Sequence, residues 1–244
     1  MTLQSPKITK VLVTGGTGLV GGAISRHLEE LGYEVIAPSR SELDLTRADE
    51  THAYLEASRP QAVVAAAALV GGIGANLSEP TRFLTENLTM QNNLLLASAA
   101  SGVSRLIFMS SSCVYPRESP QPMKEEYFLT GPFEPTNASY AVAKMAGMQL
   151  ASSLASEGRL QSTVLVPSNI YGPGDTFDLD RAHVASALVR KFVDARRDET
   201  TQVEVWGTGR ARRELLHVSD QEAASAAVIK DPDAQARGVI ELQP

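Results

Sequence analysis

Short apolar runs alternate along the chain with longer segments of helical period. A short apolar run bounded by breaks predicts a buried strand, and apolar residues recurring every three to four positions predict a helix packed on one face. The pattern predicts strands over residues 10–13, 34–37, 62–67, 105–109, 161–166 and 238–242, and helices over residues 19–31, 48–58, 80–102, 140–156 and 217–229. This alternation predicts an α/β fold, a doubly wound parallel sheet with helices on both faces.

A glycine-rich turn joins the first predicted strand to the first predicted helix. Its glycines follow the spacing G-x-x-G-x-x-G, which leaves room for a tight turn and a close approach of a pyrophosphate to the helix N-terminus. Glycines there could serve packing alone, but their place between strand and helix predicts a Rossmann-like dinucleotide site. The expected cofactor contacts in the turn are Gly15, Thr17, Gly18, Leu19, Val20 and Gly21.

The residues after the second strand bear on the choice of cofactor. Where an Asp or Glu would suit the ribose of NAD, the chain has Arg40 between two serines. A guanidinium binds a 2'-phosphate through charge-assisted hydrogen bonds, so Arg40 favours NADP(H). The alternative is that Arg40 is a solvated surface charge. Asp44 and Leu45 are expected near the adenine.

The regular alternation of predicted strands and helices ends at Tyr171, which glycines and a proline follow. Beyond it, residues 181–196 are expected to be helical and residues 203–206 extended. We therefore expect a dinucleotide-binding domain over residues 1–170, a substrate lobe over residues 171–213 and a return to the first domain over residues 214–244. The 244 residues suffice for one large domain with a smaller lobe.

Composition and charge exclude several classes of protein. With 22 Lys and Arg against 28 Asp and Glu, the net charge of −6 argues against general nucleic-acid binding. The longest apolar run, residues 62–75, is shorter than the ~20 residues of a membrane span, and the N-terminus lacks the apolar core of a secretory signal. We expect a cytoplasmic protein with no membrane partner and no metal. The single Cys113 can form no internal disulfide.

Candidate catalytic residues follow the strand that ends at Met109. Ser111, Ser112 and Cys113 stand at the carboxyl edge of the predicted sheet, where open α/β sheets bind ligands. Downstream, Tyr140 and Lys144 are four residues apart and therefore share one helix face. A cation beside a phenol lowers the phenol pKa, so Tyr140 is expected to exchange a proton with a substrate oxygen near neutral pH. The Y-x-x-x-K spacing alone arises often by chance; together with the glycine turn and the serines after the strand it becomes a strong signal for this proton exchange.

Further motifs carry a more specific signal. They are ALVGGI at 68–73, SSCVYP at 111–116, QPM at 121–123, EPTN at 134–137, NIYGP at 169–173, Asp175, HV at 183–184, VWG at 205–207, RE at 213–214 and LH at 216–217. On these residues the chain resembles the extended short-chain dehydrogenases/reductases, and within them the enzymes that epimerise and reduce GDP-4-keto-6-deoxy-mannose. The resemblance runs from about residue 11 to residue 220.

The resemblance implies roles for five residues. Ser111, Tyr140 and Lys144 match the reductase triad, in which Tyr140 protonates O4 as hydride arrives at C4. Cys113 and His183 match the pair that exchanges protons at C3 and C5, which the C4 ketone makes acidic. Residue chemistry alone favours a small buried apolar role for Cys113 and a capping or surface role for His183. The resemblance also implies cofactor contacts from Ala67, Tyr140, Lys144, Pro167, Asn169, Ile170 and His183.

Substrate contacts implied by the resemblance are Ser112, Lys191, Trp206 and Arg213. Arg213 suits a diphosphate, and Trp206 offers a flat surface to the nucleotide or sugar. Lys191 stands where the family more often has Arg, which weakens a bidentate role. Other arginines crowd the same loop, so which cation meets the phosphate stays open, as does the alternative of a mixed surface loop.

The family's chains normally continue past the strand that ends near Leu242, whereas this sequence ends at Pro244. We therefore expect a shortened C-terminal substrate lobe, a partner that completes it, or a pocket that is more open than usual. The resemblance also implies a homodimer in which helices 80–102 and 140–156 form a four-helix bundle, with Ala143, Ala146 and Gly147 allowing close approach. The sequence itself would permit a monomer.

Three functions remain open at this stage. The first is an NADPH-dependent epimerase/reductase of a nucleotide-activated 4-keto-6-deoxy sugar. The second is a related nucleotide-sugar 4-epimerase or simple ketoreductase. The third is a nucleotide-binding protein without catalysis.

Overall fold

A six-stranded parallel sheet forms the centre of the molecule. The structure is a computed structural model that describes residues 8–231 and 239–242. The strands of the sheet are β1 (Lys10–Thr14), β2 (Glu34–Ile36), β3 (Ala62–Ala65), β4 (Arg105–Met109), β5 (Gln161–Pro167) and β8 (Val239–Leu242). Their order is β2-β1-β3-β4-β5-β8, and all neighbours run parallel, so the predicted sheet is confirmed.

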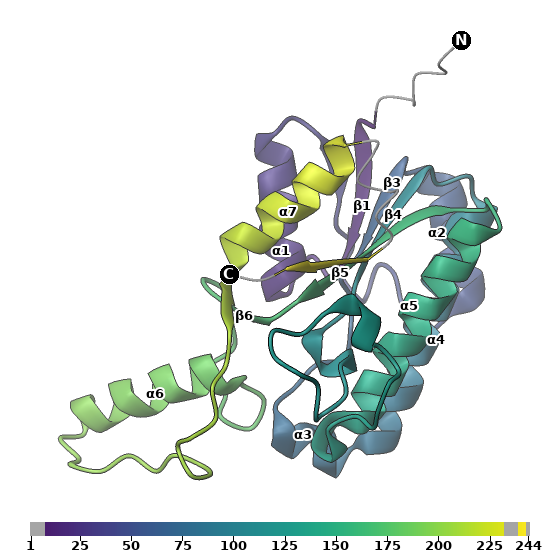
Figure 1. Ribbon diagram of the computed structural model, residues 1–244. Helices are drawn as coiled ribbons and strands as arrows, with labels where there is room; N and C mark the ends of the chain where they lie inside the picture. Colours follow the sequence, from purple (N-terminus) through teal and green to yellow (C-terminus); the bar gives the residue numbers. More distant parts are fainter. Residues whose placement is uncertain (1–7, 232–238, 243–244) are drawn as a thin grey trace.

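Helices cover both faces of this sheet (Figure 1). On one face lie α1 (Leu19–Glu30) and α7 (Val218–Lys230); on the other lie α2 (Ala48–Ser58), α4 (Pro80–Ala100) and α5 (Ala138–Ser156). Successive strand residues point to opposite faces, so Val63 packs in the core beneath α2, α4 and α5, and Val64 in the core beneath α1 and α7. Burial on both faces explains why the strands read as nearly continuous apolar runs.

The sheet has a topological switch point between β1 and β3. From β1 the chain goes to the edge strand β2 and then returns to β3 on the other side of β1. Open parallel sheets bind ligands at the carboxyl ends of strands at such a point. The turn after β1 meets the segment after β3 there, because a Cβ placed on Gly15 would lie 2.9 Å from the Cα of Ala67.

Some local elements differ from the prediction. A short helix, α3 (Ile73–Ser78), precedes α4, and β6 (Asn169–Tyr171) pairs with β7 (Leu215–His217) in a separate two-stranded parallel sheet. Elements of three to six residues are too short to show a clear period. Single 3-10 turns, which the sequence did not indicate either, are η1 (Ser112–Val114), η2 (Glu125–Tyr127) and η3 (Pro135–Asn137).

The extended segment expected over residues 203–206 is not a strand. Its Glu204 carbonyl accepts a hydrogen bond from the Lys191 side chain at 2.9 Å, and so the backbone is held by a side chain and not by a strand ladder. The helix expected over residues 181–196 is confirmed as α6 (Val184–Arg197).

Helix α6 and the segment after it project from the rest of the molecule (Figure 1). Within α6, all of which the structure describes, Ser186 alone is buried. The side chains of Val189, Phe192 and Val193 are more than half exposed. The division of the chain into a cofactor domain and a substrate lobe stays a prediction. Across the residues that the structure describes, none of the helices is both long and apolar enough to cross a membrane.

Candidate active site

The glycine turn forms a cradle without side chains at the start of α1. Gly15 has φ of +74°, which favours glycine, and its carbonyl accepts a hydrogen bond from the Gly18 amide at 2.9 Å. A Cβ on Gly21 would lie 2.3 Å from the Gly15 carbonyl oxygen. The first-turn amides of Leu19 and Val20 have no acceptor within the helix, so they can receive an anionic group. The turn therefore fits the pyrophosphate of a dinucleotide.

Replacing Gly21 with Ala is expected to weaken NADPH binding by more than about tenfold and to lower the free energy of unfolding by about 1–3 kcal/mol. The added methyl group meets backbone atoms, which cannot rotate away as a side chain could. Fluorescence titration with NADPH and urea unfolding measure the two effects. Gly74→Ala is the matched control, because a Cβ there meets nothing within 4 Å. If the two variants had equal NADPH affinity and equal free energy of unfolding, the turn would not be the pyrophosphate site.

The segment after β2 holds the predicted cofactor residues Arg40, Asp44 and Leu45. Arg40 is 65% exposed, and its Nη2 lies 3.7 Å from Glu86 Oε2. The Asp44 carboxylate accepts hydrogen bonds from the backbone amide and hydroxyl of Thr46, which lower the pKa of Asp44. Leu45 is buried. The contact of Asp44 and Leu45 with an adenine stays a prediction.

The predicted catalytic residues gather at the carboxyl end of β4. The Lys144 Nζ, which comes from α5, donates a hydrogen bond to the Met109 carbonyl at 2.8 Å and lies 5.8 Å from the centre of the Tyr140 ring. Ser111 precedes η1, and its hydroxyl accepts a hydrogen bond from the Cys113 amide at 3.4 Å. The hydroxyl, thiol, phenol and ammonium therefore share one end of the sheet, beside the glycine turn.

Burial dominates the electrostatics of this cluster. It raises the pKa of the Cys113 thiol to about 11, and the Ser111 side chain and the Lys144 charge offset only part of that rise. It also raises the pKa of Tyr140, and the nearby Cys113 adds to the rise. Burial lowers the pKa of Lys144 to about 8. At pH 7, Tyr140 and Cys113 therefore keep their protons, and Lys144 is mostly charged.

The expectation that Lys144 lowers the pKa of Tyr140 is wrong for this structure. The Lys144 ammonium is hydrogen-bonded to the Met109 carbonyl, so its charge is directed to a backbone oxygen. Removing water from the phenol disfavours phenolate, and the nearby Cys113 acts in the same direction. A protonated phenol suits donation of a proton to a substrate oxygen.

Replacing Lys144 with Met is expected to stabilise the folded chain at pH 7 by about 2 kcal/mol. The pKa falls from 10.5 to about 8, which corresponds to about 3 kcal/mol, and loss of the bond to Met109 offsets about 1 kcal/mol. Because the folded pKa is below the unfolded one, the penalty of the buried charge is complete below about pH 8 and disappears as pH rises through 10.5. Urea unfolding at pH 7 and pH ~10 measures the difference.

The exposed Lys124 supplies the control for this experiment. Lys124→Met should leave the pH dependence of unfolding as it is in the unaltered chain. A Lys144→Met variant that is less stable than the unaltered chain at pH 7 would show that the ammonium contributes to folding and is not a cost.

His183 occupies the N-cap position of α6 without a side-chain capping hydrogen bond, and its side chain is exposed. The residues before it touch the turn after β3: the Gly72 amide donates to the Arg181 carbonyl at 3.2 Å, and a Cβ on Gly72 would lie 2.9 Å from the Ala182 oxygen. The neighbouring Gly71 packs near Phe83, whose ring lies 6.4 Å from that of Tyr140. Packing contacts thus connect the His183 segment with the catalytic cluster.

A second contact holds the first turn of α6. The buried Ser186 hydroxyl donates a hydrogen bond to the Asp175 carboxylate, which comes from the loop after β6. Among the hydrogen bonds and ion pairs of residues 8–231, none joins the His183 side chain to Cys113. Their joint action stays a prediction.

The remaining residues were predicted to contact cofactor or substrate, and they lie in β5, in β6 and from α6 onward. Pro167 ends β5, and Asn169 and Ile170 lie in β6, where the Asn169 side chain donates to the Glu214 carbonyl at 3.0 Å. The Lys191 Nζ lies 5.3 Å from the centre of the Trp206 ring, and Trp206 is 71% exposed. The structure thus brings Lys191 and Trp206 together. The Arg213 guanidinium donates to the neighbouring Arg212 carbonyl and is exposed.

A family model described as the NAD-dependent epimerase/dehydratase family matches residues 11–242. The chain belongs to this family. The match spans the glycine turn, the cluster after β4 and α5, and the resemblance to the extended short-chain dehydrogenases/reductases is thereby confirmed.

Within this family, the chain is similar to two curated relatives and one solved structure whose names give a more specific function. A protein of Oryza sativa subsp. japonica with the name "Probable GDP-L-fucose synthase 1" is 45% identical over 213 residues, 86% of this chain and 65% of that protein. The GDP-L-fucose synthase of Sinorhizobium fredii is 42% identical over 91% of this chain and 70% of its own length. The structure of a GDP-L-fucose synthetase from Naegleria fowleri bound to NADP has a TM-score of 0.86 and 29% identity, covering 99% of this chain and 79% of that one. The chain spans 62–70% of the length of eight of the curated relatives that it matches.

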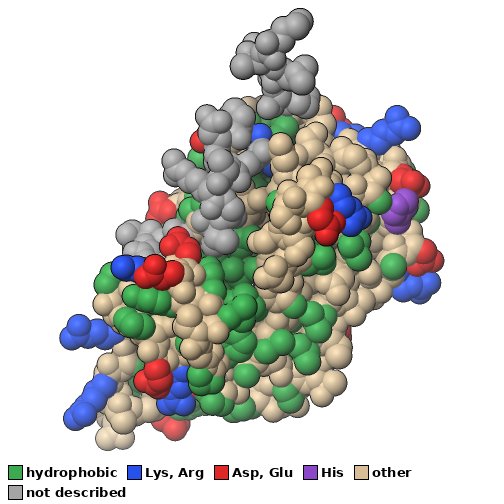
Figure 2. Space-filling view, turned by 45° about the vertical axis from the view of Figure 1, so that its right-hand side comes forward, with side chains coloured by type: hydrophobic (Ala, Val, Ile, Leu, Met, Phe, Trp, Pro, Cys, Tyr) green, Lys and Arg blue, Asp and Glu red, His purple; other side chains and the backbone are tan. Residues whose placement is uncertain are grey.

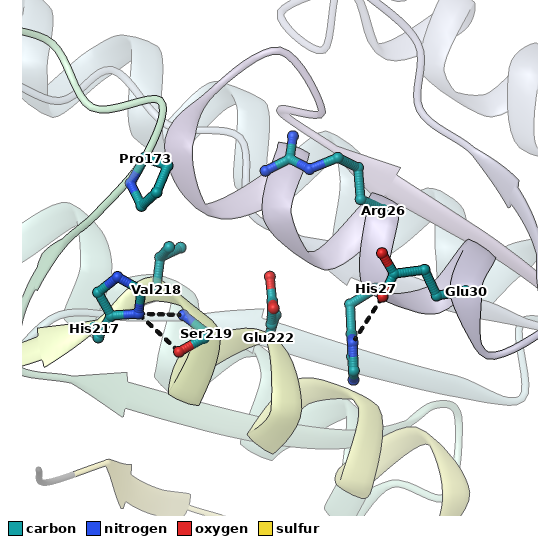
Figure 3. A pocket seen from close by; sticks show the side chains of 8 residues that line it. All are labelled: Arg26, His27, Glu30, Pro173, His217, Val218, Ser219 and Glu222. Carbon is teal, nitrogen blue, oxygen red and sulfur yellow. Dashed lines mark hydrogen bonds and ion pairs between the residues drawn. The ribbon is translucent and has the colours of Figure 1, made fainter.

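A small pocket of about 180 Å³ lies between α1 and the start of α7 (Figure 3). Arg26, His27 and Glu30 reach it from one helix, and Glu222 from the other. The His217 Nδ1 lies 2.7 Å from the Ser219 hydroxyl and accepts a hydrogen bond from its amide, which caps α7. Since none of the predicted catalytic residues lines this pocket, it is separate from the candidate active site.

Sequence reasoning missed residues that shape the site. Asn87 in α4 holds the loop after β3, because its side chain accepts from the Leu69 amide at 2.8 Å and donates to the Leu69 carbonyl at 3.0 Å. Gly16 and Gly22 belong to the cradle, since a Cβ on either would lie less than 3 Å from a neighbouring atom. The doubled glycines of the turn were a visible signal; the isolated Asn87 had none.

Proposed function

We propose that this chain is an NADP(H)-dependent epimerase/reductase that converts GDP-4-keto-6-deoxy-mannose to GDP-L-fucose. The observation that carries the proposal is the cluster of Ser111, Cys113, Tyr140 and Lys144 at the carboxyl end of β4, beside the glycine cradle. Relatives with the name GDP-L-fucose synthase, and a related structure bound to NADP, support the substrate and the cofactor.

The residues present fit the proposed cofactor. The glycine turn and the first amides of α1 would hold the pyrophosphate, and Arg40 would bind the 2'-phosphate. When bound, reduced nicotinamide supplies the hydride for carbon C4 of the sugar.

The chain's own residues supply the protons. A C4 ketone acidifies C3 and C5, so at each carbon a base removes a proton, the electron pair moves into an enolate, and an acid returns a proton on the opposite face. Cys113 and His183 carry the groups for this exchange. Ser111 would hold O4 with its hydroxyl, and Tyr140 would protonate O4 while the charge of Lys144 stabilises the oxygen. One NADPH and one proton are consumed.

The deciding experiment mixes the purified chain with NADPH and GDP-4-keto-6-deoxy-mannose in deuterated water. NADPH absorbance reports hydride transfer, and NMR of the product locates deuterium. Oxidation of NADPH with deuterium at C3 and C5 is the expected result. Oxidation without deuterium would replace the proposal with a simple ketoreductase. Bound NADPH with no turnover would point to a nucleotide-binding protein without catalysis.

A ketoreductase acting on a nucleotide-activated 4-keto sugar is the second candidate. It is favoured by one observation: the Lys144 Nζ lies 5.8 Å from the centre of the Tyr140 ring, whereas none of the described hydrogen bonds or ion pairs joins His183 to Cys113. Such an enzyme would need Ser111, Tyr140 and Lys144 but neither Cys113 nor His183.

We also infer a homodimer through the outer faces of α4 and α5. The two helices pack side by side, and Leu96 and Val142 on them are 46% and 44% exposed. Figure 2, which turns the right-hand side of Figure 1 forward, shows apolar side chains gathered in the centre and lower part of the view. The mass of the chain in solution, from sedimentation equilibrium, tests this inference. A cytoplasmic location stays a prediction from the sequence.

One expectation about this dimer is corrected. Ala143 and Gly147 are buried within the chain, and a Cβ on Gly147 would lie 2.4 Å from the Phe108 ring. They allow α5 to approach its own sheet and α4, and so they cannot line the outer face. Of the three small residues expected there, only Ala146 is exposed.

A further inference from the structure

Arg40, the expected ligand of the 2'-phosphate, has a carboxylate beside it. Its Nη2 lies 3.7 Å from Glu86 Oε2, and the Glu86 side chain is 24% exposed. Arg40 follows β2, whereas Glu86 belongs to α4, so the fold creates this pair. Among the residues that the structure describes, Glu86 is the ion-pair partner of Arg40.

Arg82 holds the Glu86 carboxylate in place. Its Nε donates to Glu86 Oε1 at 2.7 Å, and its Nη1 donates to Glu79 Oε2 at 2.7 Å. The second oxygen of Glu86, Oε2, is covered by protein and has no hydrogen-bond partner within the described residues. This oxygen is the one nearest to Arg40, so the Arg40 guanidinium is the cation that it faces.

The other acids near Arg40 are engaged by hydroxyl and amide groups. Glu42 Oε2 accepts hydrogen bonds from the amide and the hydroxyl of Ser39, at 2.8 and 2.7 Å. Asp44 Oδ1 accepts from the amide and hydroxyl of Thr46. Glu86 is therefore the acid whose free oxygen competes for Arg40.

We propose that Glu86 is a specificity-determining residue that weakens the preference of this site for NADP(H) over NAD(H) by competing with the 2'-phosphate for Arg40. The inference rests on the proposed function, in which Arg40 binds that phosphate. A phosphate must displace or share the guanidinium and also meets the charge of Glu86. The 2'-hydroxyl of NAD(H) is uncharged, so it neither needs the guanidinium of Arg40 nor is repelled by Glu86.

Equilibrium titration of the purified chain with NADPH and with NADH, followed by nicotinamide fluorescence, tests this proposal. Glu86→Gln is expected to tighten NADPH binding about two- to fivefold, the range of an exposed ion pair, and to leave NADH binding unchanged. Added salt should reduce the effect. Glu79→Gln is the matched control, because it removes the same charge and also a partner of Arg82, yet Glu79 does not pair with Arg40.

A double-mutant cycle shows whether Glu86 acts through Arg40. In an Arg40→Leu background, Glu86→Gln should no longer change NADPH affinity. Equal tightening by Glu79→Gln would assign the effect to net charge and overturn the proposal. Weaker NADPH binding by Glu86→Gln would overturn it too, since Glu86 would then orient Arg40 for the phosphate. If the unaltered chain binds neither nucleotide, both the proposed function and this inference are wrong. If Glu86→Gln leaves the ratio of NADPH affinity to NADH affinity unchanged, this inference alone is wrong.

Discussion

Replacing Tyr140 with Phe is expected to lower kcat for NADPH oxidation between about a hundredfold and ten-thousandfold, the usual range for removing a general acid. The phenol keeps its proton at pH 7 because burial raises the pKa of Tyr140, so it is ready to protonate O4. Phe retains the ring that faces Phe83 at 6.4 Å, and the variant should therefore fold normally.

Stopped-flow measurement of NADPH oxidation, with a separate titration of NADPH binding, checks this result. NADPH affinity should change little, because the lost hydroxyl serves the reacting oxygen. Tyr54→Phe is the matched control, since it removes the same hydroxyl from α2, away from the carboxyl end of β4. A Tyr140→Phe variant that keeps more than a tenth of the rate would exclude the phenol as the proton donor.

Replacing Cys113 with Ser is expected to reduce deuterium incorporation at C3 and C5 by about a hundredfold or more while NADPH binding stays unchanged. The serine hydroxyl fits the space of the thiol but exchanges protons far less readily near neutral pH. NMR of GDP-4-keto-6-deoxy-mannose, incubated with the chain in deuterated water without NADPH, measures the exchange apart from reduction.

His183→Asn should give a comparable loss of exchange, although the two side chains come from separate elements. His52→Asn is the control for this variant, because His52 is a histidine on the surface of α2. Because burial raises the pKa of Cys113 to about 11, exchange should rise with pH up to that value if the thiolate removes the proton. Normal exchange in both Cys113→Ser and His183→Asn would leave the chain a simple ketoreductase.

The glycine turn that forms the cofactor cradle could be predicted from the sequence, because its residues are close together in the chain. Gly15, Gly18 and Gly21 lie within one turn, and part of the demand for glycine there is local, because Gly15 has φ of +74° and a Cβ on Gly21 would meet the Gly15 backbone. Tyr140 and Lys144 likewise share a face because one helix carries both. The alternation of strands and helices depends on periodicities of two and 3.6, which a single chain shows directly, and so the α/β sheet was predicted correctly.

What each of these residues does depends on neighbours that are distant in the chain. Only packing shows that Gly147 faces Phe108 and Gln91 of its own chain, that the Lys144 ammonium bonds to the Met109 carbonyl, and that Glu86 stands beside Arg40. The pKa of Tyr140 was predicted in the wrong direction for the same reason: a helical spacing reveals a nearby cation but not the removal of water by the surrounding protein. The sequence by itself determined the sheet, the glycine turn and the reactive groups. The tertiary structure decided which charges meet and which groups lose water, because both depend on contacts between segments that no local pattern encodes.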